Sequence, residues 1–473
     1  MHELYLGGCF AFSVSINEQD LSSTLGLTIF FFFFFFFLIF LNDKNKTQSL
    51  FVRMYFYLFL LGAGLLATVA SNPTNPNLKR SGPSYNFGLT RTSRLGRVPG
   101  GHRQRPYSVP LLSVFEDVGY LVNVTLGEGQ ETFSLILDTG SSDTWVIEAN
   151  YTCLNQTTFA IEPQSACGFN PGYSPSNDFQ LIPDVNYNTS YGQGTTINGV
   201  FGYGTLGLEG LNIHKQQMAL GTDLYWTGGY GEGVAGILGM AFGNLTRMYA
   251  GTNFSADDLA NVENYSPVVE TIFFKENLTR PYFSLELSRA GRNASSAFGG
   301  YLEFGAVPDL NRPGWASVPI QTSHTPRNPT VERLLYYTIQ IDGTVIGGSI
   351  YSANTSSQYI VDSGTTLMTL PAADAARINA LFVPPAEIIE GYYTVPCNAT
   401  APQNIGMQIG GVEFPINQLD LINLNPIMPG FCVTGIQDGD AQSDGIYILG
   451  DVFLTNVLAV FDYRDYQIHF HAQ

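Results

Sequence analysis

The chain has 473 residues, including 50 glycines, 26 tyrosines and 34 phenylalanines, and only 13% of its residues are charged. This length allows two domains, and the composition favours a β-rich globular protein over a helical or disordered one. The formal net charge of −18 argues against a nucleic acid as the partner, because phosphate binding requires a basic surface.

Two apolar runs lie near the start of the chain. The first, residues 25–41, contains an uninterrupted run of phenylalanines from Phe30 to Phe37. The second, residues 54–70, follows basic residues and ends in small ones, which is typical of a secretory signal peptide cut before Ser71. We therefore interpret Met54 as the true start and residues 1–53 as a non-native extension from a faulty gene model. The alternative is that residues 25–41 anchor the protein in a membrane.

The next segment, residues 71–105, is strongly basic. It contains seven lysines and arginines and no acidic residue, whereas residues 106–473 carry 11 basic and 35 acidic side chains, a net charge of −24. A short basic segment before an acidic body is typical of a propeptide that lies on its own enzyme. A disordered basic linker is the alternative. The candidate processing sites are Lys79-Arg80 and the chain near Arg105.

Glycosylation sequons and cysteines favour secretion independently. Eleven Asn-x-Ser/Thr sequons follow residue 105, and Asn264 is set aside because Pro267 follows it closely. The remaining candidates are Asn123, Asn150, Asn155, Asn188, Asn244, Asn253, Asn277, Asn293, Asn354 and Asn398. Apart from Cys9, the four cysteines allow three disulfide connectivities. The simplest is local, Cys153–Cys167 and Cys397–Cys432.

Short runs rich in Val, Ile, Tyr, Phe and Thr recur from residue 106 onward, separated by Gly, Asn and Pro. This spacing predicts an all-β fold. The strands are expected at 120–126, 133–137, 200–208, 283–287, 336–341, 446–449 and 457–462. Helical patterns are confined to 267–275 and 372–382.

An internal repeat divides this β-rich region into two related halves. The stretch FSLILDTGSSDTW at 133–145 is repeated as SQYIVDSGTTLMTL at 357–370. A second element repeats in the same order, as GILGMAF at 236–242 and YILGDVF at 447–453. Two paired motifs in one order predict two structurally related lobes, which we place at 106–290 and 291–473.

Each repeat ends an apolar strand in an aspartate, Asp138 or Asp362. If the lobes pack about a pseudo-twofold axis, the two carboxyls face each other, share one proton and titrate in two separate steps. One ionised and one protonated carboxyl around a water provide a general base and a general acid for peptide hydrolysis. The glycine after each aspartate suits a tight turn. Hydroxyls at Ser141 and Thr365 are placed to hydrogen-bond the outer carboxylate oxygens.

Over residues 110–473 the sequence resembles the pepsin family of aspartic endopeptidases. The resemblance rests on the two Asp-Thr/Ser-Gly-Ser/Thr copies, the two Ile-Leu-Gly elements and the Tyr-Gly-x-Gly-Thr stretch at 191–195. It implies a bilobal all-β fold, with two related β-barrel-like lobes and an active-site cleft between them. The sequence departs from the family pattern at Ser363, where threonine is frequent, and in the enlarged loop between Cys153 and Cys167.

The resemblance also implies individual roles. Asp138 and Asp362 would be the catalytic pair, and Thr139 and Ser363 would form a hydroxyl grip between the lobes. The residues supporting the pair would be Thr139, Gly140, Ser141, Ser363, Gly364 and Thr365. Tyr191 would cover the cleft from a β-hairpin flap and hydrogen-bond Trp145. The other flap residues would be Gly192, Gly194 and Thr195.

The sequence therefore predicts a secreted, glycosylated aspartic endopeptidase, made as a zymogen and active in acid, where its carboxylates lose charge and repel one another less. The resemblance implies a monomer whose cleft takes about six to eight residues of extended polypeptide. We expect no cofactor and no metal, since the six histidines form no metal-binding motif. We prefer an extracellular location over a vacuolar or membrane-anchored one. The alternative function is a catalytically inactive pepsin-like binding protein.

Overall fold

The structure is a computed structural model of the whole chain. It describes residues 107–114, 119–191, 195–225, 233–258, 261–275, 278, 280–289, 296–305, 309–325, 328–440 and 446–473. All of these lie in one compact unit, Ala67–Gln473. The expected extension 1–53, signal peptide 54–70 and propeptide 71–105 lie outside the described residues, as do Gly192, Gly194, Asn277 and Asn293.

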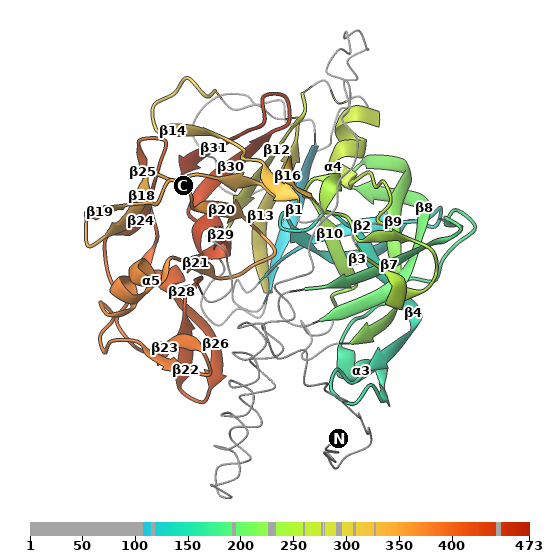
Figure 1. Cartoon of the computed structure of the whole chain (residues 1–473), viewed down its shortest axis with the longest axis horizontal. Coiled ribbons are helices and arrows are strands. Elements are labelled where there is room, and N and C mark those ends of the chain that lie inside the picture. The colour runs from blue at the N-terminus through green and yellow to red at the C-terminus, as the bar shows by residue number, and fades with distance from the viewer. Residues whose placement is uncertain are drawn as a thin grey trace, which may run out of the picture. The chain divides into compact units, whose positions relative to one another are not determined.

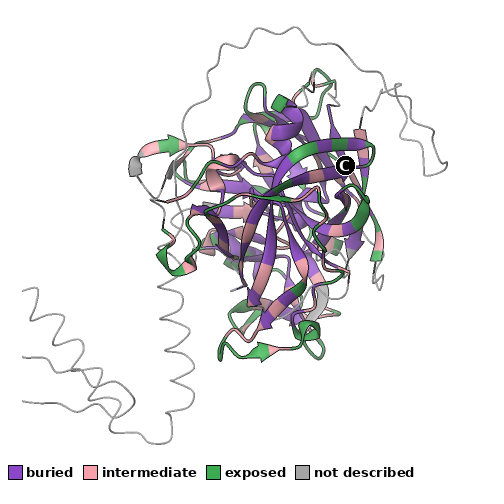
Figure 2. Cartoon of the chain, turned by 90° about the vertical axis from the view of Figure 1, so that its right-hand side faces the viewer, coloured by how far each residue is buried: buried purple, intermediate pink, exposed green. Residues whose placement is uncertain are grey.

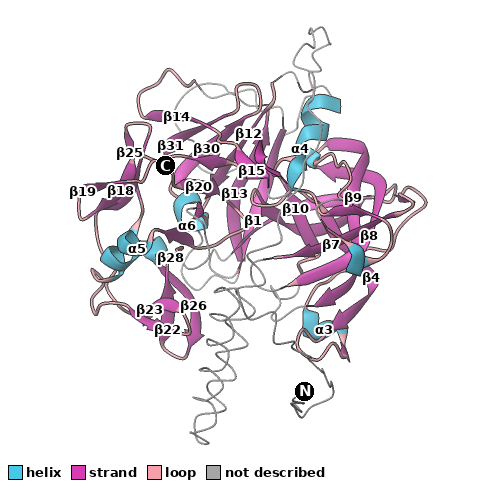
Figure 3. Ribbon diagram, viewed as in Figure 1, coloured by secondary structure: helices cyan, strands magenta, loops and turns pink. Residues whose placement is uncertain are grey.

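Strands dominate the described residues, and 16 of them form one sheet (Figures 1 and 3). Its first strands are β1 (Tyr107–Val114), β2 (Gly119–Leu126), β3 (Glu131–Asp138), β4 (Trp145–Leu154), β5 (Ile161–Glu162), β6 (Gln180–Leu181), β7 (Val185–Ser190), β8 (Thr196–Leu208), β9 (Leu211–Tyr225), β10 (Gly236–Gly239) and β11 (Met248–Ala250). The others are β12 (Tyr282–Leu287), β13 (Ser296–Phe304), β14 (Trp315–Pro319), β30 (Val457–Asp462) and β31 (Gln467–Ala472). The order is β11-β7-β8-β9-β4-β10-β3-β2-β1-β13-β12-β30-β31-β14, with β5 beside β4 and β6 beside β8.

The remaining described strands form smaller sheets in the second half of the chain. One contains β17 (Thr338–Ile339), β20 (Gln358–Val361), β29 (Ile446–Leu449), β21 (Met368–Leu370) and β28 (Ile436–Asp438). A second contains β19 (Ser349–Ser352), β18 (Gly343–Ile346), β24 (Ile405–Ile409) and β25 (Val412–Pro415). A third contains β22 (Glu387–Ile389), β23 (Tyr392–Pro396), β27 (Phe431–Thr434) and β26 (Ile422–Met428), and the last pairs β15 (Ser323–Thr325) with β16 (Asn328–Arg333). The predicted all-β fold is confirmed.

Helices are short throughout the described residues. The α-helices are α3 (Gln164–Cys167), α4 (Val268–Glu270), α5 (Ala372–Asn379) and α6 (Asp451–Leu454). The 3-10 helices are η1 (Gly243–Leu245), η2 (Phe254–Ala256) and η4 (Gln418–Leu421), and η3 (Thr271–Lys275) is a π-helical turn. Both expected helical segments are present, although the second ends at Asn379. The strand expected over 336–341 is shorter than predicted, because only Thr338 and Ile339 pair with β20.

The two sequence repeats adopt the same local arrangement. In the first, β10 runs parallel to β3, so that Gly239 lies opposite Asp138. In the second, β29 runs parallel to β20, so that Leu449 lies opposite Val361, directly before Asp362. In Figure 1 the strands of the first repeat, blue to green, gather on one side, and the orange and red strands of the second gather on the other. The repeat therefore corresponds to two related lobes.

Strands from the beginning, the middle and the end of the described region join the two lobes. β1 pairs with β2 on one side and with β13 on the other, and β12 pairs with β30. Figure 2 shows that buried residues run through the interior of the described strands, and among them the rings of Phe283 and Phe461 stack with centroids 4.3 Å apart. Tyr337 donates a hydrogen bond across the lobes to the carbonyl of Met240 at 2.6 Å. The proposed boundary at residue 290 falls in the connection between β12 and β13, outside the described residues.

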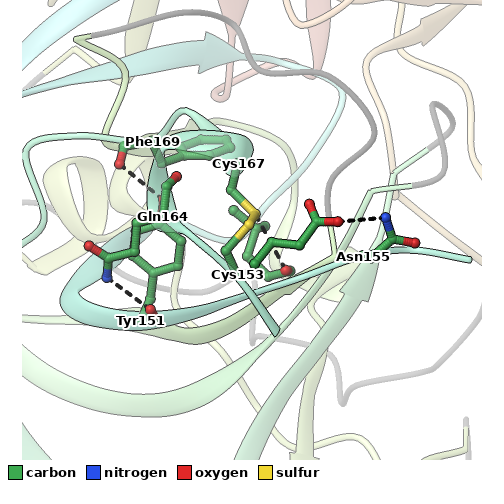
Figure 4. The surroundings of a disulfide bond; sticks show 8 residues. Tyr151, Cys153, Asn155, Gln164, Cys167 and Phe169 are labelled. Carbon is green, nitrogen blue, oxygen red and sulfur yellow. Dashed lines mark hydrogen bonds between the residues drawn. A yellow bond between two sulfur atoms is a disulfide. The ribbon is translucent and has the colours of Figure 1, made fainter. Parts of the chain in front are cut away.

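The structure contains both local disulfides, Cys153–Cys167 and Cys397–Cys432. The enlarged loop closed by the first disulfide contains β5 and α3, and β5 pairs with the end of β4. Figure 4 shows how Gln164 supports it: its amide donates to the Tyr151 carbonyl at 2.8 Å, and the Tyr151 hydroxyl donates to the Gln164 carbonyl at 2.9 Å. The extra residues thus form an ordered extension of the first lobe.

Candidate active site

The two aspartates occupy matching positions at the ends of β3 and β20, and both are buried, with Asp138 6% and Asp362 7% exposed. One oxygen of Asp138 accepts a hydrogen bond from the Gly140 amide at 2.7 Å, and the other accepts one from the Ser141 hydroxyl. Asp362 repeats this pattern with Gly364 and Thr365. The hydroxyls expected to hold the outer oxygens are in those positions. Each carboxylate is therefore oriented by its own turn.

The residues that follow the aspartates bind the two turns to each other. The Thr139 hydroxyl donates to the Val361 carbonyl at 2.9 Å, and the Ser363 hydroxyl donates to the Leu137 carbonyl at 2.8 Å. The Ser363 amide donates to the Thr139 hydroxyl at 2.9 Å, and the Thr139 amide donates to the Ser363 hydroxyl at 3.2 Å. These buried bonds fix the separation of the lobes at the aspartates.

The two motif glycines provide space for the aspartates. A Cβ atom on Gly140 would lie 2.5 Å from the carboxyl carbon of Asp362, and a Cβ on Gly364 would collide with the carboxyl of Asp138. Neither glycine is among the described residues that have a positive φ. Their conformation would therefore admit another residue, whereas the close approach of the opposite carboxyl excludes one. The turns expected from the sequence are present, with each glycine amide donating to its own aspartate, and the approach of the opposite carboxyl is a further reason for glycine that the sequence did not indicate.

The Ile-Leu-Gly elements support the same turns from behind. The Met240 amide, directly after the first element, donates to the Asp138 carbonyl at 2.8 Å, and the Asp362 amide donates to the Leu449 carbonyl at 3.1 Å. A Cβ on Gly239 would lie 2.6 Å from the backbone nitrogen of Asp143, which leaves no room for a side chain. The second repeated motif thus packs directly against the first and hydrogen-bonds to it.

The electrostatic environment favours a proton on the pair. Burial raises the pKa of Asp138 from its ordinary 3.8 to about 7, and the charge of Asp362 acts in the same direction. Hydrogen bonds from Ser141 and Gly140 partly oppose this rise. Two carboxyls that share a proton can supply an acid and a base to the same substrate group. The arrangement is thus suited to adding water across a carbonyl.

Tyr191 lies directly after β7, at the base of the expected flap hairpin. Its hydroxyl accepts a hydrogen bond from the indole N–H of Trp145 at 2.8 Å, as the sequence predicted, and lies 3.3 Å from the hydroxyl of Tyr187. The Tyr191 amide donates to the carbonyl of Thr195 at 2.8 Å, which closes the hairpin across the undescribed residues 192–194. Tyr191, the expected flap tyrosine, is therefore connected to the strand that follows the Asp138 turn.

The sequons differ in how their asparagines are used. Exposed side chains occur at Asn123, Asn150, Asn253, Asn354 and Asn398. The partly buried ones donate hydrogen bonds: Asn155 to Glu162 (Figure 4), Asn188 to Phe254 and Asp257, and Asn244 to Leu334. Among the described sequons, the five exposed asparagines therefore present an amide nitrogen to which a sugar could be attached without breaking a hydrogen bond to another segment.

Two further side chains close to the pair were not identified from the sequence. Asp143 is 3% exposed and lies in the same turn as Asp138. Tyr336 is the second, because burial and the charges of Asp362 and Asp138 raise its pKa. Asp143 could have been noticed in the sequence, because the aligned position in the second repeat is the apolar Leu367. Tyr336 had none, because it is distant in sequence from both motifs.

Within the described ranges, no helix is both long and apolar enough to cross a bilayer. Among those same residues, no group of three or more His, Cys, Asp or Glu side chains is placed to hold a metal ion.

Comparisons with known proteins agree with this geometry. A sequence profile of the family described as eukaryotic aspartyl protease matches residues 119–473. A protein of Aspergillus fumigatus, described as a probable aspartic-type endopeptidase, is 32% identical over 416 residues, which cover 84% of this chain and 90% of the relative. Cathepsin E of Mus musculus is 27% identical over 395 residues, which cover 81% of this chain and 86% of the relative.

The fold has a counterpart among solved structures. The aspartic proteinase from Irpex lacteus superposes with a TM-score of 0.59 and 22% identity, covering 77% of this chain and 97% of that one. This likeness confirms the bilobal pepsin-like fold, while the profile and the Aspergillus relative carry the family assignment. The chain belongs to the eukaryotic aspartyl protease family and is an aspartic-type endopeptidase.

Proposed function

We propose that the protein hydrolyses peptide bonds with a water molecule activated between Asp138 and Asp362. The observation that carries the proposal is the reciprocal packing of the two turns, in which each motif glycine makes room for the opposite carboxyl. Such packing has no value for two isolated structural turns. It brings two buried acids together at a cost in folding free energy, as is typical of a site selected for function instead of stability.

The chemistry follows from one shared proton. The ionised carboxyl removes a proton from the water as its oxygen attacks the peptide carbonyl carbon, and the protonated carboxyl donates a hydrogen bond to the developing oxyanion. The C–N bond then breaks as the leaving nitrogen receives a proton from the pair, which returns the pair to its singly protonated state. Gly140, Ser141, Gly364 and Thr365 hold the carboxyls in place throughout.

Polypeptides are the proposed substrates. Tyr191 and Thr195, together with Gly192 and Gly194, would cover an extended peptide of about six to eight residues that lies between the lobes. The hydrogen bond from Trp145 to the Tyr191 hydroxyl would set the height of this cover above the aspartates. We propose that the enzyme acts as a monomer.

Activity in acid is supported by the charge on the pair and on the body of the protein. Because the pKa of Asp138 is about 7, the pair retains its shared proton in acid and loses it as the pH rises through neutral. The net charge of −24 over residues 106–473 adds self-repulsion near neutral pH, which protonation of carboxylates relieves.

Secretion as a zymogen is the proposed cellular context. Residues 54–70 would direct export, residues 71–105 would lie on the acidic enzyme until they are removed, and residues 1–53 would be absent from the natural protein. N-terminal sequencing of the intact precursor and of the extracellular protein tests all three assignments. A peptide from residues 1–53 would overturn the proposed start at Met54.

Cleavage of a denatured protein at about pH 3–4, with and without pepstatin, tests the activity itself. Asp138→Asn and Asp362→Asn should each abolish inhibitor-sensitive cleavage, whereas Asp309→Asn, at an exposed aspartate, should not. Failure of the wild type to cleave after verified removal of residues 71–105 would favour the inactive binding protein instead.

A further inference from the structure

Asp143 is a buried acid that the proposed chemistry does not use. One of its oxygens accepts a hydrogen bond from the Thr246 hydroxyl at 2.6 Å, and the other accepts one from the Arg247 amide at 2.7 Å. Burying a carboxylate costs free energy even when hydrogen bonds offset part of the cost. The presence of an acid at this buried position therefore calls for an explanation. Burial also raises the pKa of Asp143 to about 6, and the bonds from Thr246 and Arg247 partly oppose that rise.

The two donors belong to the segment that supports the flap strand. Thr246 and Arg247 directly precede β11, and the Thr246 hydroxyl also accepts a hydrogen bond from the Met248 amide at 3.2 Å. β11 pairs with β7, placing Met248 opposite Tyr187. Since β7 leads directly to Tyr191, a continuous path runs from the Asp138 turn through Asp143 and β11 to the flap.

The aromatic side chains around Asp143 follow the same path. Tyr187 and Tyr265 are buried and Tyr191 is partly buried, and the charge of Asp143 adds to desolvation in raising the pKa values of all three. Tyr265 accepts a hydrogen bond from the Thr144 amide at 3.0 Å, directly after Asp143. The Asp143 carboxyl is therefore near enough to these three tyrosine hydroxyls to act on them electrostatically.

The second repeat is a natural comparison. Its turn has the same order of residues as the first, but Leu367 replaces the acid. Both turns carry an aspartate with its glycine and hydroxyl, so Asp143 is not needed to build such a turn. Its presence is specific to the lobe that carries Tyr191.

We propose that Asp143 is a positioning residue for proteolysis, which holds the segment behind the flap tyrosine at a fixed place relative to the Asp138 turn. This inference rests on the proposed function. The hydrogen bonds of Asp143, rather than its charge, perform this role. An uncharged asparagine should therefore replace it, because its side chain could accept from the Arg247 amide and donate to the Thr246 hydroxyl.

Four variants test the proposal. Asp143→Ala should lower kcat/KM for a peptide substrate about tenfold, mainly through KM, because a displaced flap binds the substrate less well. Asp143→Asn should remain within about threefold of the wild type. Thr246→Val, which removes one donor and preserves shape, should fall between them. Asp462→Ala is the matched control, since Asp462 is also a buried acid, 2% exposed, whose partners include the Arg464 and Asp465 amides of its own turn and the side chain of His469 on β31, none of which belongs to β7 or β11.

A double-mutant cycle with Tyr191→Phe separates positioning from general loss of stability. In the Tyr191→Phe background, Asp143→Ala should cost less than about threefold, because the hydroxyl that it positions is already absent. Purely additive effects, or equal effects of Asp143→Ala and Asp462→Ala on KM, would overturn the proposal. If Asp143→Ala does not fold, Thr246→Val in the same cycle decides. Failure of the proposed function is a different outcome, since the wild type would then show no cleavage to compare.

Discussion

The carboxyl of Asp138 occupies the space that a Cβ atom on Gly364 would need. Gly140 stands in the same relation to Asp362, so each lobe accommodates the reactive group of the other. A single added methyl group on either glycine therefore acts on the opposite lobe.

Gly364→Ala should reduce kcat/KM by at least about a hundredfold, because the turn or the Asp138 carboxyl must shift and the shared proton is then misplaced. Peptide cleavage assays measure the loss, and circular dichroism verifies the fold. Gly119→Ala is the matched control, since a Cβ there would meet nothing within 4 Å. Full activity of Gly364→Ala would contradict the proposed catalytic pair.

Thr139→Val should destabilise the protein by about 1–3 kcal/mol and also lower activity. The substitution keeps the shape but leaves the Val361 carbonyl and the Ser363 amide, both buried between the lobes, without their partner. Urea unfolding in an Asp138→Asn background, which prevents self-digestion, gives the stability. The outcome that contradicts this account is an unfolding midpoint unchanged from that of the Asp138→Asn parent.

Stability should fall as the pH rises from about 4 to about 7. Asp138 and Asp143 have folded pKa values of about 7 and about 6, above their ordinary 3.8, so the folded state retains protons that the unfolded chain releases. Protonation therefore favours the folded state throughout this range. Asp138→Asn should show a weaker pH dependence of its melting temperature than the wild type. Equal slopes would mean that Asp138 does not bind its proton more tightly in the folded state.

Glycans should be absent from Asn188 and Asn244, although both lie in sequons. The Asn188 amide donates to Phe254 and Asp257, and the Asn244 amide donates to Leu334, so attachment of a sugar would break these bonds. Glycopeptide mass spectrometry of the secreted protein measures occupancy. Exposed Asn150 and Asn398 serve as internal positives, and a fully occupied Asn188 would mean that the segment bearing Asp257 is held differently.

Much of this site could be predicted from the sequence because it is duplicated. Asp138 and Asp362 were found through the repeat, and the Ile-Leu-Gly elements were found as its second half. The sequence did not show why the Ile-Leu-Gly elements contain glycine, because Gly239 packs against the backbone of Asp143 and that contact exists only in three dimensions. The motif glycines were explained by turn conformation, since the sequence gives no indication that a carboxyl from the other lobe approaches them.

Other features depend on distant pairing and left no local pattern. Tyr337 reaches Met240 and Tyr463 from a run predicted as one long strand, of which only Thr338 and Ile339 pair in a sheet. The role suggested for Asp143 likewise depends on Thr246 and Arg247, which lie far along the chain. Sequence reasoning therefore identified the reactive residues better than the residues that place them.

The position of β1 limits where the proposed processing protease could cut. Tyr107 already pairs with Phe304, and the eight residues of β1 lie between β2 and β13. A processing protease that cuts near Arg105 would release the basic segment and leave this strand whole. A cut within β1 would instead shorten a strand that pairs with both β2 and β13, so the proposed processing has a downstream limit at Tyr107.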